Sequence, residues 1–178
     1  MTIEVMEMAA SKARMVSFDL NYRSKLWSVT DAKRCYHELL PHVNVLITNR
    51  YDCATFFDLE GTEEDMAHEL DNKFGMEAVA FTRSGSDANV AYWGSSVWFR
   101  NEMHSSENQT LNILDRFGAG DAFTSGLLIG LINEDPVMAL NYGNAMAVLS
   151  QTTFGDLSWI RQCDLDDYFA RKDMRIRR

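Results

Sequence analysis

The sequence predicts an α/β fold with a mostly parallel sheet, and three observations carry this prediction. Short β-branched and apolar runs occur at 15–20, 43–48 and 78–82, as is typical of buried strands. Stretches with apolar residues at helical spacing separate these runs. Residues that cap helices mark where the stretches begin and end. In sheets built this way, ligands bind beyond the carboxyl ends of the strands.

Helices in the first half of the chain are predicted from their caps. A Ser or Thr followed three residues later by an Asp is typical of a helix start, and it occurs at Ser28 and Thr62. Pro41 and Gly75 are expected to end the two helices. The expected helices cover 3–12, 29–40 and 62–74.

The second half is predicted to hold antiparallel strands and three more helices. Ser84-Gly85-Ser86-Asp87 is expected to be a turn. A buried helix is expected over 122–132, Pro136 is expected in the first turn of the next helix, and Asp164 is expected to cap a short last one. The expected strands cover 89–93, 97–99 and 111–114.

Composition indicates a cytoplasmic globular protein. The 178 residues are 46% hydrophobic and 24% charged, enough for one domain with a real core. The net charge of −9 disfavours nucleic acid and anionic membranes as partners. The three cysteines are far apart and include no C-x-x-C, which favours free thiols over disulfides or zinc. The first residues resemble neither a signal peptide nor a membrane span.

The segment D-R-F-G-A-G-D at 115–121 is the strongest candidate for a functional site. Gly118 and Gly120 allow backbone angles and close approaches that side chains block. The helix that follows directs free N–H groups and a positive dipole end at the loop, which favours anion binding. A carboxylate at Asp121 is explained if it accepts the proton of an attacking hydroxyl group. The alternative is that Asp121 only caps the helix, and the residues by themselves leave both readings open.

The run D-R-F-G-A-G-D-A-F-T-S-G-L-L, which begins at Asp115, closely resembles the C-terminal signature of the PfkB family of ribokinase-like sugar kinases. The resemblance implies a ribokinase-like (Rossmann-like) three-layer sandwich and the use of ATP with Mg²⁺. It makes Asp121 the general base, with an anion hole formed by the N–H groups of Gly118, Ala119, Gly120 and Asp121. Arg116 is similar to the 2-keto-3-deoxygluconate kinase branch.

The D-x-N-x-R segment that ends at Arg23 resembles the same branch. A buried strand would deliver Asn21 and Arg23 to the ligand edge of the sheet. The guanidinium fork of Arg23 suits a carboxylate or a phosphate, so the resemblance implies that both residues bind substrate beside Asp121. The alternative for Arg23 is a salt bridge to Asp19 or another nearby acid.

Asn49 and Asp52 occupy the place of the family's N-x-x-E motif, which helps to organise magnesium and phosphate. Asp52, which replaces the glutamate, is one methylene shorter and could still hold a metal-bound water. The alternative for this pair is a helix cap.

Two further segments resemble the family's nucleotide site. Thr82-Arg83-Ser84-Gly85 is similar to a T-x-G-x-x-G nucleotide loop, with departures at Ser84 and at 88–89, and the alternative is a polar hairpin turn. Asn144 matches the adenine-side helix, where small neighbours would let a flat base approach. Packing of that helix onto the sheet is an alternative compatible with this role.

The resemblance covers essentially the whole chain, but full-length family members are longer. We therefore expect 1–178 to be the C-terminal part of a PfkB-type carbohydrate kinase domain, incomplete at its N-terminus and without the β lid. The complete enzyme, expected to be a homo-oligomer, would phosphorylate a sugar acid such as 2-keto-3-deoxygluconate. The alternatives are another PfkB kinase, such as a fructokinase or ribokinase, and a non-catalytic nucleotide-binding remnant.

Overall fold

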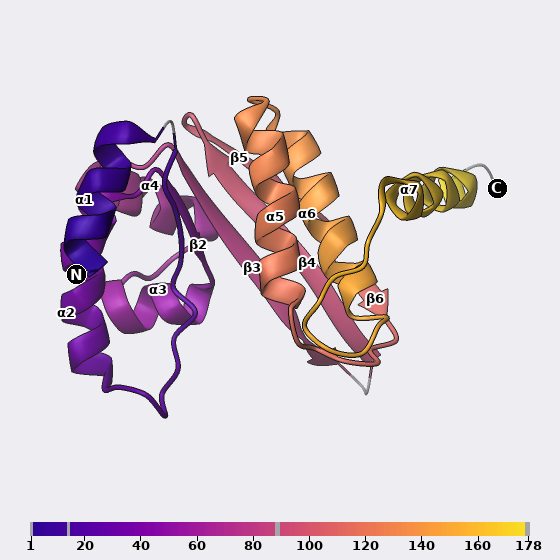
Figure 1. Cartoon of the computed structure of the whole chain (residues 1–178), viewed down its shortest axis with the longest axis horizontal. Coiled ribbons are helices and arrows are strands. Elements are labelled where there is room, and N and C mark those ends of the chain that lie inside the picture. Colours follow the sequence, from indigo (N-terminus) through magenta and orange to yellow (C-terminus); the bar gives the residue numbers. More distant parts are fainter. Residues whose placement is uncertain (1, 14, 88–89, 177–178) are drawn as a thin grey trace. The chain divides into compact units, whose positions relative to one another are not determined.

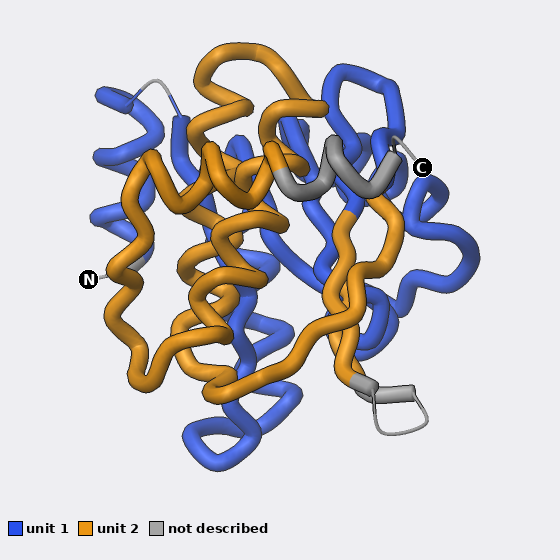
Figure 2. The backbone as a smooth tube through the Cα atoms, turned by 90° about the vertical axis from the view of Figure 1, so that its right-hand side faces the viewer, with its two compact units in different colours: residues 1–82, 96–105 blue, residues 83–95, 106–178 orange. Residues whose placement is uncertain are grey.

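The structure is a computed structural model that describes residues 2–13, 15–87 and 90–176. The chain forms two compact units, shown in separate colours in Figure 2. Unit 1 comprises residues 1–82 and 96–105, and unit 2 comprises residues 83–95 and 106–178. The mixed sheet has β6 (Gln109–Leu111) beside β4, and its strand order is β1 (Ser17–Asp19), β2 (Val45–Thr48), β3 (Ala78–Asp87), β4 (Val90–Phe99) and β5 (Glu102–Ser105). Among the described residues, no helix is both long and apolar enough to cross a membrane.

The parallel strands predicted for the first half are confirmed in unit 1. Strand β2 (Val45–Thr48) lies between β1 (Ser17–Asp19) and β3 (Ala78–Asp87), and both neighbours pair with it in parallel. All four side chains of β2 are buried, which explains why its sequence is continuously apolar rather than alternating.

The helix caps predicted for unit 1 are also confirmed. The Ser28 side chain accepts a hydrogen bond from the backbone N–H of Asp31, and Thr62 forms a reciprocal capping box. Gly75 ends its helix in the left-handed conformation, with φ of +72°. The helices are α1 (Thr2–Lys12), α2 (Val29–Leu39), the 3₁₀ turn η1 (Leu40–His42), α3 (Arg50–Phe57) and α4 (Glu63–Phe74).

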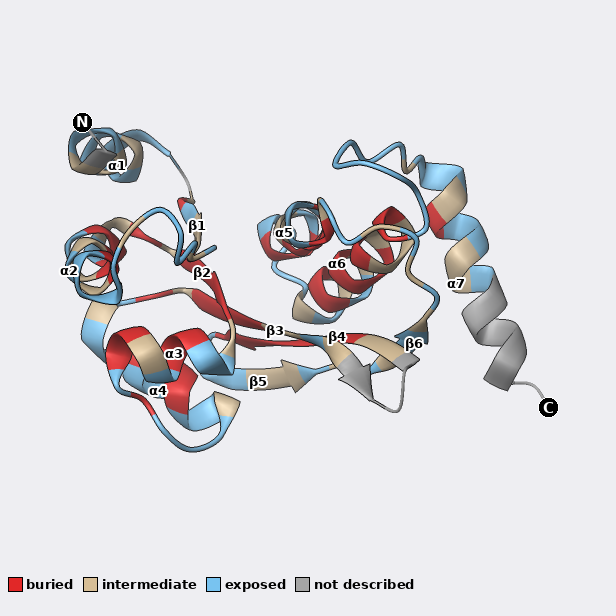
Figure 3. Cartoon of the chain, turned by 90° about the horizontal axis from the view of Figure 1, so that it is seen from below, coloured by how far each residue is buried: buried red, intermediate tan, exposed pale blue. Residues whose placement is uncertain are grey.

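Aromatic rings and aliphatic side chains fill the core of unit 1. Tyr36 is 1% exposed and meets the ring of Phe56 edge to face, with 5.0 Å between ring centroids. The Tyr36 hydroxyl donates to the carbonyl of Leu20 over 2.8 Å, which joins α2 to the end of β1. Cys53, on α3, is a fully buried member of the same core. Figure 3 shows the buried residues in red. Each large apolar side chain that is fully buried, such as that of Phe56, stabilises the fold by roughly 1.5–3 kcal/mol.

Unit 2 is built around two helices, α5 (Ala119–Ile132) and α6 (Pro136–Ser150), which lie side by side in Figure 1. Glycines let their backbones approach closely. A Cβ atom added at Gly130 would lie 2.1 Å from the backbone nitrogen of Ala139. Strand β6 (Gln109–Leu111) pairs antiparallel with β4 (Val90–Phe99), and α7 (Gln162–Ile176) follows.

One long strand replaces the two strands predicted at 89–93 and 97–99. Strand β4 runs without a break through Ser95 and Ser96, and its second half pairs antiparallel with β5 (Glu102–Ser105). Both serines are fully buried. The Ser95 hydroxyl donates to Asn144 over 2.8 Å and that of Ser96 donates to Glu63 over 2.6 Å. These tertiary partners satisfy polar groups that would otherwise favour a turn.

Other predicted boundaries also need correction. The turn predicted at 84–87 is wrong, because β3 extends through Asp87; positions 88–89 lie outside the described residues. The strand predicted at 111–114 ends at Leu111, since the N–H of Leu114 donates to the carbonyl of Gln151 instead. Helix α3 was predicted only through the alternative reading of Asn49 and Asp52 as a helix cap, and α7 is not short, having 15 residues.

Candidate active site

The glycine loop of unit 2 leads directly into α5. Gly118 is the N-cap of this helix and has φ of +75°, a conformation that strains other residues. A Cβ atom here would lie only 2.8 Å from the carbonyl oxygen of Asp156. Backbone conformation and space therefore both require glycine at this position.

The first turn of α5 begins at Ala119, earlier than the predicted start at 122. The first helical hydrogen bond runs from the N–H of Ala122 to the carbonyl of Gly118, over 2.9 Å. The N–H groups of Ala119, Gly120 and Asp121 therefore have no acceptor within the helix. Gly120 and Asp121 are both exposed. The positive end of the helix dipole adds to these donors, so this turn suits an anion.

The position of Asp121 bears on its two readings. Gly118, and not Asp121, occupies the N-cap position. Asp121 lies on the first turn with its carboxylate at the surface, within the turn that offers the free N–H groups. A carboxylate placed here can accept a proton from a hydroxyl group held at the same turn.

Asp115 fixes the start of the glycine loop. Its carboxylate accepts a 3.0 Å hydrogen bond from the N–H of Gly155 and a 3.1 Å hydrogen bond from the N–H of Phe117. These bonds, that from Gly155 first, hold the pKa of Asp115 below its usual value. Sequence reasoning gave this residue no separate role, because Gly155 lies 40 positions away along the chain.

The ends of the parallel strands in unit 1 carry a second set of predicted residues. Asn21 follows β1 with φ of +38°, and its N–H donates to the Asp19 carboxylate over 3.1 Å. Tyr22 anchors the segment, since its ring lies 4.9 Å from that of Phe56. Asn21 and Arg23, on either side of Tyr22, are exposed. Both residues therefore lie just after the end of β1, as predicted, and their contact with substrate stays a prediction.

Asn49 and Asp52 form the helix cap that was the alternative reading for them. The Asn49 side chain accepts a 2.9 Å bond from the Asp52 N–H and donates a 2.8 Å bond to the Asp52 carboxylate. Asp52 is 8% exposed, and this burial raises its pKa against the opposing effect of the Asn49 bond. Across the described part of the chain, no group of three or more His, Cys, Asp or Glu residues is placed to hold a metal ion. The metal role of Asp52 stays a prediction.

The predicted nucleotide loop lies within β3 rather than after it. In unit 1, the Thr82 hydroxyl donates to the carbonyl of Thr48 over 3.4 Å. In unit 2, the Arg83 guanidinium donates 2.9 Å bonds to the carbonyls of Ser95 and Ser106. Gly85 leaves room for a ring, because a Cβ atom there would lie 2.7 Å from the Tyr92 hydroxyl. Packing accounts for these contacts, and the nucleotide roles of Thr82, Arg83 and Gly85 stay predictions.

Asn144 is buried between α6 and β4 and is only 3% exposed. Its side-chain oxygen accepts a 3.0 Å bond from the Trp93 indole and a 2.8 Å bond from the Ser95 hydroxyl. The packing alternative therefore accounts for these contacts, and a nucleotide contact by Asn144 stays a prediction. Neither Trp93 nor Ser95 had been predicted as part of this region, since no local pattern links β4 to α6.

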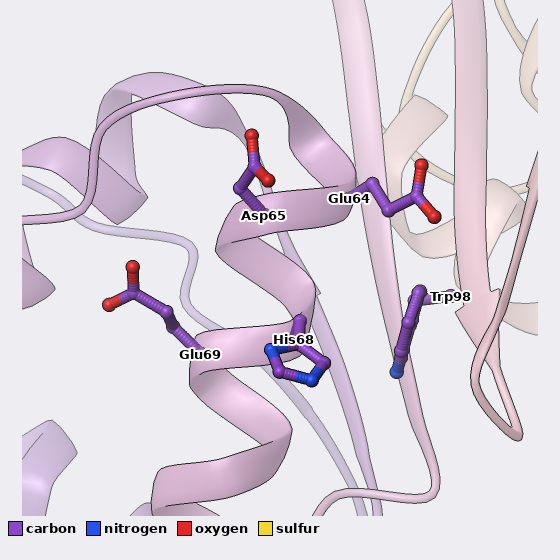
Figure 4. Close-up of a pocket in the computed structure, with 5 residues that line it drawn as sticks. All are labelled: Glu64, Asp65, His68, Glu69 and Trp98. Carbon is purple, nitrogen blue, oxygen red and sulfur yellow. The ribbon is translucent and has the colours of Figure 1, made fainter.

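Unit 1 also has a pocket of about 310 Å³ on the surface of α4 (Figure 4). None of the predicted site residues lines it. Its side chains already have structural roles: Asp65 belongs to the capping box, and His68 meets Trp98 edge to face at 6.1 Å. The lining residues are Glu64, Asp65, His68, Glu69 and Trp98.

The α/β fold, with Asp121 on a glycine-capped helix start, agrees with the ribokinase-like fold that the sequence predicts. The family model described as "pfkB family carbohydrate kinase" matches residues 2–161. The chain belongs to this family.

Named relatives agree with this assignment. The chain is 36% identical over 178 residues to a 2-dehydro-3-deoxygalactonokinase of Haloferax volcanii, covering 99% of this chain and 54% of the relative. It is 30% identical over 152 residues to a 2-dehydro-3-deoxygluconokinase of Haemophilus influenzae, covering 82% and 45%. A PfkB family carbohydrate kinase from Listeria grayi superposes with a TM-score of 0.86 at 28% identity, covering 95% of this chain and 54% of that one. The chain thus spans about half the length of the curated relatives it matches.

Proposed function

We propose that the protein transfers the γ-phosphate of ATP to a hydroxyl group of a 2-keto-3-deoxy sugar acid, with Asp121 as the general base. The single observation that carries the proposal is the exposed Asp121 carboxylate on the glycine-capped first turn of α5. The names of the Haloferax and Haemophilus relatives support the substrate class. They differ in the sugar, so the proposal extends to gluconate- and galactonate-derived acids alike.

In the proposed reaction, the Asp121 carboxylate takes the proton of the substrate hydroxyl group. The hydroxyl oxygen then forms a bond to the γ-phosphorus as the bond to ADP breaks. The N–H groups at Gly118–Asp121 stabilise the charge on the phosphoryl oxygens as it moves. Arg23, exposed after β1, would pair with the carboxylate of the sugar acid or with the phosphate.

Family membership implies Mg²⁺, which in kinases takes one or two protein carboxylates together with phosphate oxygens and waters. Asp52 would hold a metal-bound water in this limited role, with its carboxylate oriented by the 2.8 Å hydrogen bond from Asn49. The ion would supply positive charge to the phosphates when bound.

The test is an Asp121→Asn variant of the full-length enzyme, assayed for ADP release with a panel of keto-deoxy-gluconate, keto-deoxy-galactonate, fructose and ribose. Loss of the base is expected to lower kcat by about 10²–10⁴-fold. Binding of an ATP analogue, measured by calorimetry, should change little, since the backbone donors remain. Normal turnover by the variant would refute the role of Asp121. A wild-type preference for fructose or ribose would refute the substrate class.

A non-catalytic nucleotide-binding protein is the second candidate, favoured by the half-length coverage of the relatives. Nucleotide binding by the full-length protein without turnover of any sugar in the panel would support it over the kinase. The exposed Asp121 argues against this candidate, because its negative charge would repel a phosphate bound at the same turn.

A further inference from the structure

Helix α5 must be held firmly at its N-terminal turn if Asp121 is to meet a hydroxyl group in a fixed geometry. Further along α5, the glycines Gly126 and Gly130 set its distance from α6, backbone against backbone. At the N-cap of the first turn, Gly118 lies close to the Asp156 backbone, since a Cβ atom there would be 2.8 Å from that carbonyl oxygen. The first large buried side chain after Asp121 along α5 is Phe123, two residues later.

Phe123 is fully buried in unit 2. A Cβ atom added at Gly143 would lie 3.0 Å from the Phe123 ring, so α6 approaches the ring closely. The ring also contacts Trp93 of β4, with 5.8 Å between ring centroids and 56° between ring planes. A change in the orientation of the Trp93 indole would therefore alter the packing around the Phe123 ring.

The Trp93 indole is itself held by one hydrogen bond. Its N–H donates to the side-chain oxygen of Asn144 over 3.0 Å, and both residues are buried, at 6% and 3% exposure. The Ser95 hydroxyl donates to the same oxygen over 2.8 Å, which fixes the orientation of the Asn144 amide. A single oxygen thus receives two donors from β4.

We propose that Asn144 and Trp93 are positioning residues for Asp121, which act through the Phe123 ring on the first turn of α5. The inference rests on the proposed function for its catalytic consequence. It departs from the sequence-based prediction that Asn144 contacts the nucleotide. Both residues control how the base and the anion hole are placed, and neither touches a reactant.

The test is a double-mutant cycle of Asn144→Ala and Trp93→Phe. Trp93→Phe keeps an aromatic ring and removes the indole N–H, while Asn144→Ala removes its acceptor. Each variant should shift the backbone amide signals of Gly120 and Asp121 in ¹H–¹⁵N spectra of the chain. In an active kinase, each should lower kcat by about 10–100-fold and leave the KM for ATP within about twofold of wild type. The double variant should be no worse than the poorer single one.

The matched control is Trp98→Phe, on the same strand. Trp98 is 5% exposed, and its indole N–H has no hydrogen-bond partner among the described residues. Removing this N–H should leave the Gly120 and Asp121 signals in place. Asn144→Asp keeps the acceptor oxygen and should restore the signals that Asn144→Ala displaces.

Two results would overturn the proposal. One is a rise of tenfold or more in the KM for ATP with Asn144→Ala but not with Trp93→Phe, which would make Asn144 a direct nucleotide contact. The other is amide signals that stay unchanged in both variants. If Asn144→Ala does not fold, the signals of Trp93→Phe decide in the same way. If the full-length wild-type enzyme has no kinase activity, the proposed function fails, while the amide signals still test the positioning.

Discussion

At the residue scale, glycine identity in the loop has two separable causes. Gly118 and Gly75 both adopt the left-handed conformation, with φ of +75° and +72°. They differ in their surroundings. A Cβ atom at Gly75 would have no neighbour within 4 Å, whereas one at Gly118 would lie 2.8 Å from the Asp156 carbonyl oxygen.

This pair gives a matched prediction. Gly75→Ala should lower the free energy of unfolding by about 1–2 kcal/mol, the cost of a left-handed non-glycine residue. Gly118→Ala should cost more and should also lower turnover, because the N-cap must move away from the Asp156 carbonyl. Urea denaturation of both variants, together with ADP release, checks this. Equal losses of stability with unchanged turnover would contradict the crowding argument.

At the element scale, the helix caps could be predicted from the sequence, whereas the hydrogen bond from Gly155 to Asp115 that anchors the glycine loop could not. The capping patterns at Ser28 and Thr62 operate over three residues, so the sequence contains all the partners. Strand β4 was misread because Ser95 and Ser96 find their acceptors on α6 and α4. The bond from Gly155 to Asp115 is likewise nonlocal.

That anchor has a pH signature. In the folded protein the pKa of Asp115 lies below its ordinary value of 3.8. The ionised Asp115 carboxylate therefore stabilises the fold fully above pH 3.8, and this stabilisation is lost as the pH falls through the lower pKa of the folded state. The stability difference between wild type and Asp115→Asn should therefore shrink as the pH falls below 3.8. Thermal unfolding of both proteins measures it, and the Gly155 amide signal should titrate in the same window. A difference that stays constant through this window would contradict the anchor. The Gly75 amide, bonded to the Asp71 carbonyl, is the control.

At the scale of the whole molecule, the fold class and the glycine loop could be predicted because their signals are local and dense. The roles of Thr82, Arg83, Gly85 and Asn144 could not be settled in this way. The sequence does not distinguish a polar side chain that binds a nucleotide from one that binds backbone carbonyls elsewhere in the same chain. Arg83 shows this, since its fork fits the carbonyls of Ser95 and Ser106 as well as a phosphate.

Coverage of about half of each relative leads to a prediction for the chain by itself. We expect the 178-residue chain to bind an ATP analogue weakly and to turn over keto-deoxy-gluconate slowly or not at all. An active site that encloses less of its substrate excludes less water, so its electrostatic stabilisation of the transition state is weaker and turnover is slower. Calorimetry and ADP release on the purified chain test this, and robust turnover would refute it.

The burial of Cys53 has a practical consequence for chemical labelling. Burial, aided by the nearby charges of Asp52 and Glu63, raises the pKa of this thiol to about 11. Only roughly one molecule in ten thousand would carry the reactive thiolate at neutral pH. Cys163 is exposed and Cys35 is partly so. A maleimide dye should therefore attach first at Cys163 on α7, which offers a reporter position in unit 2 without any engineered cysteine.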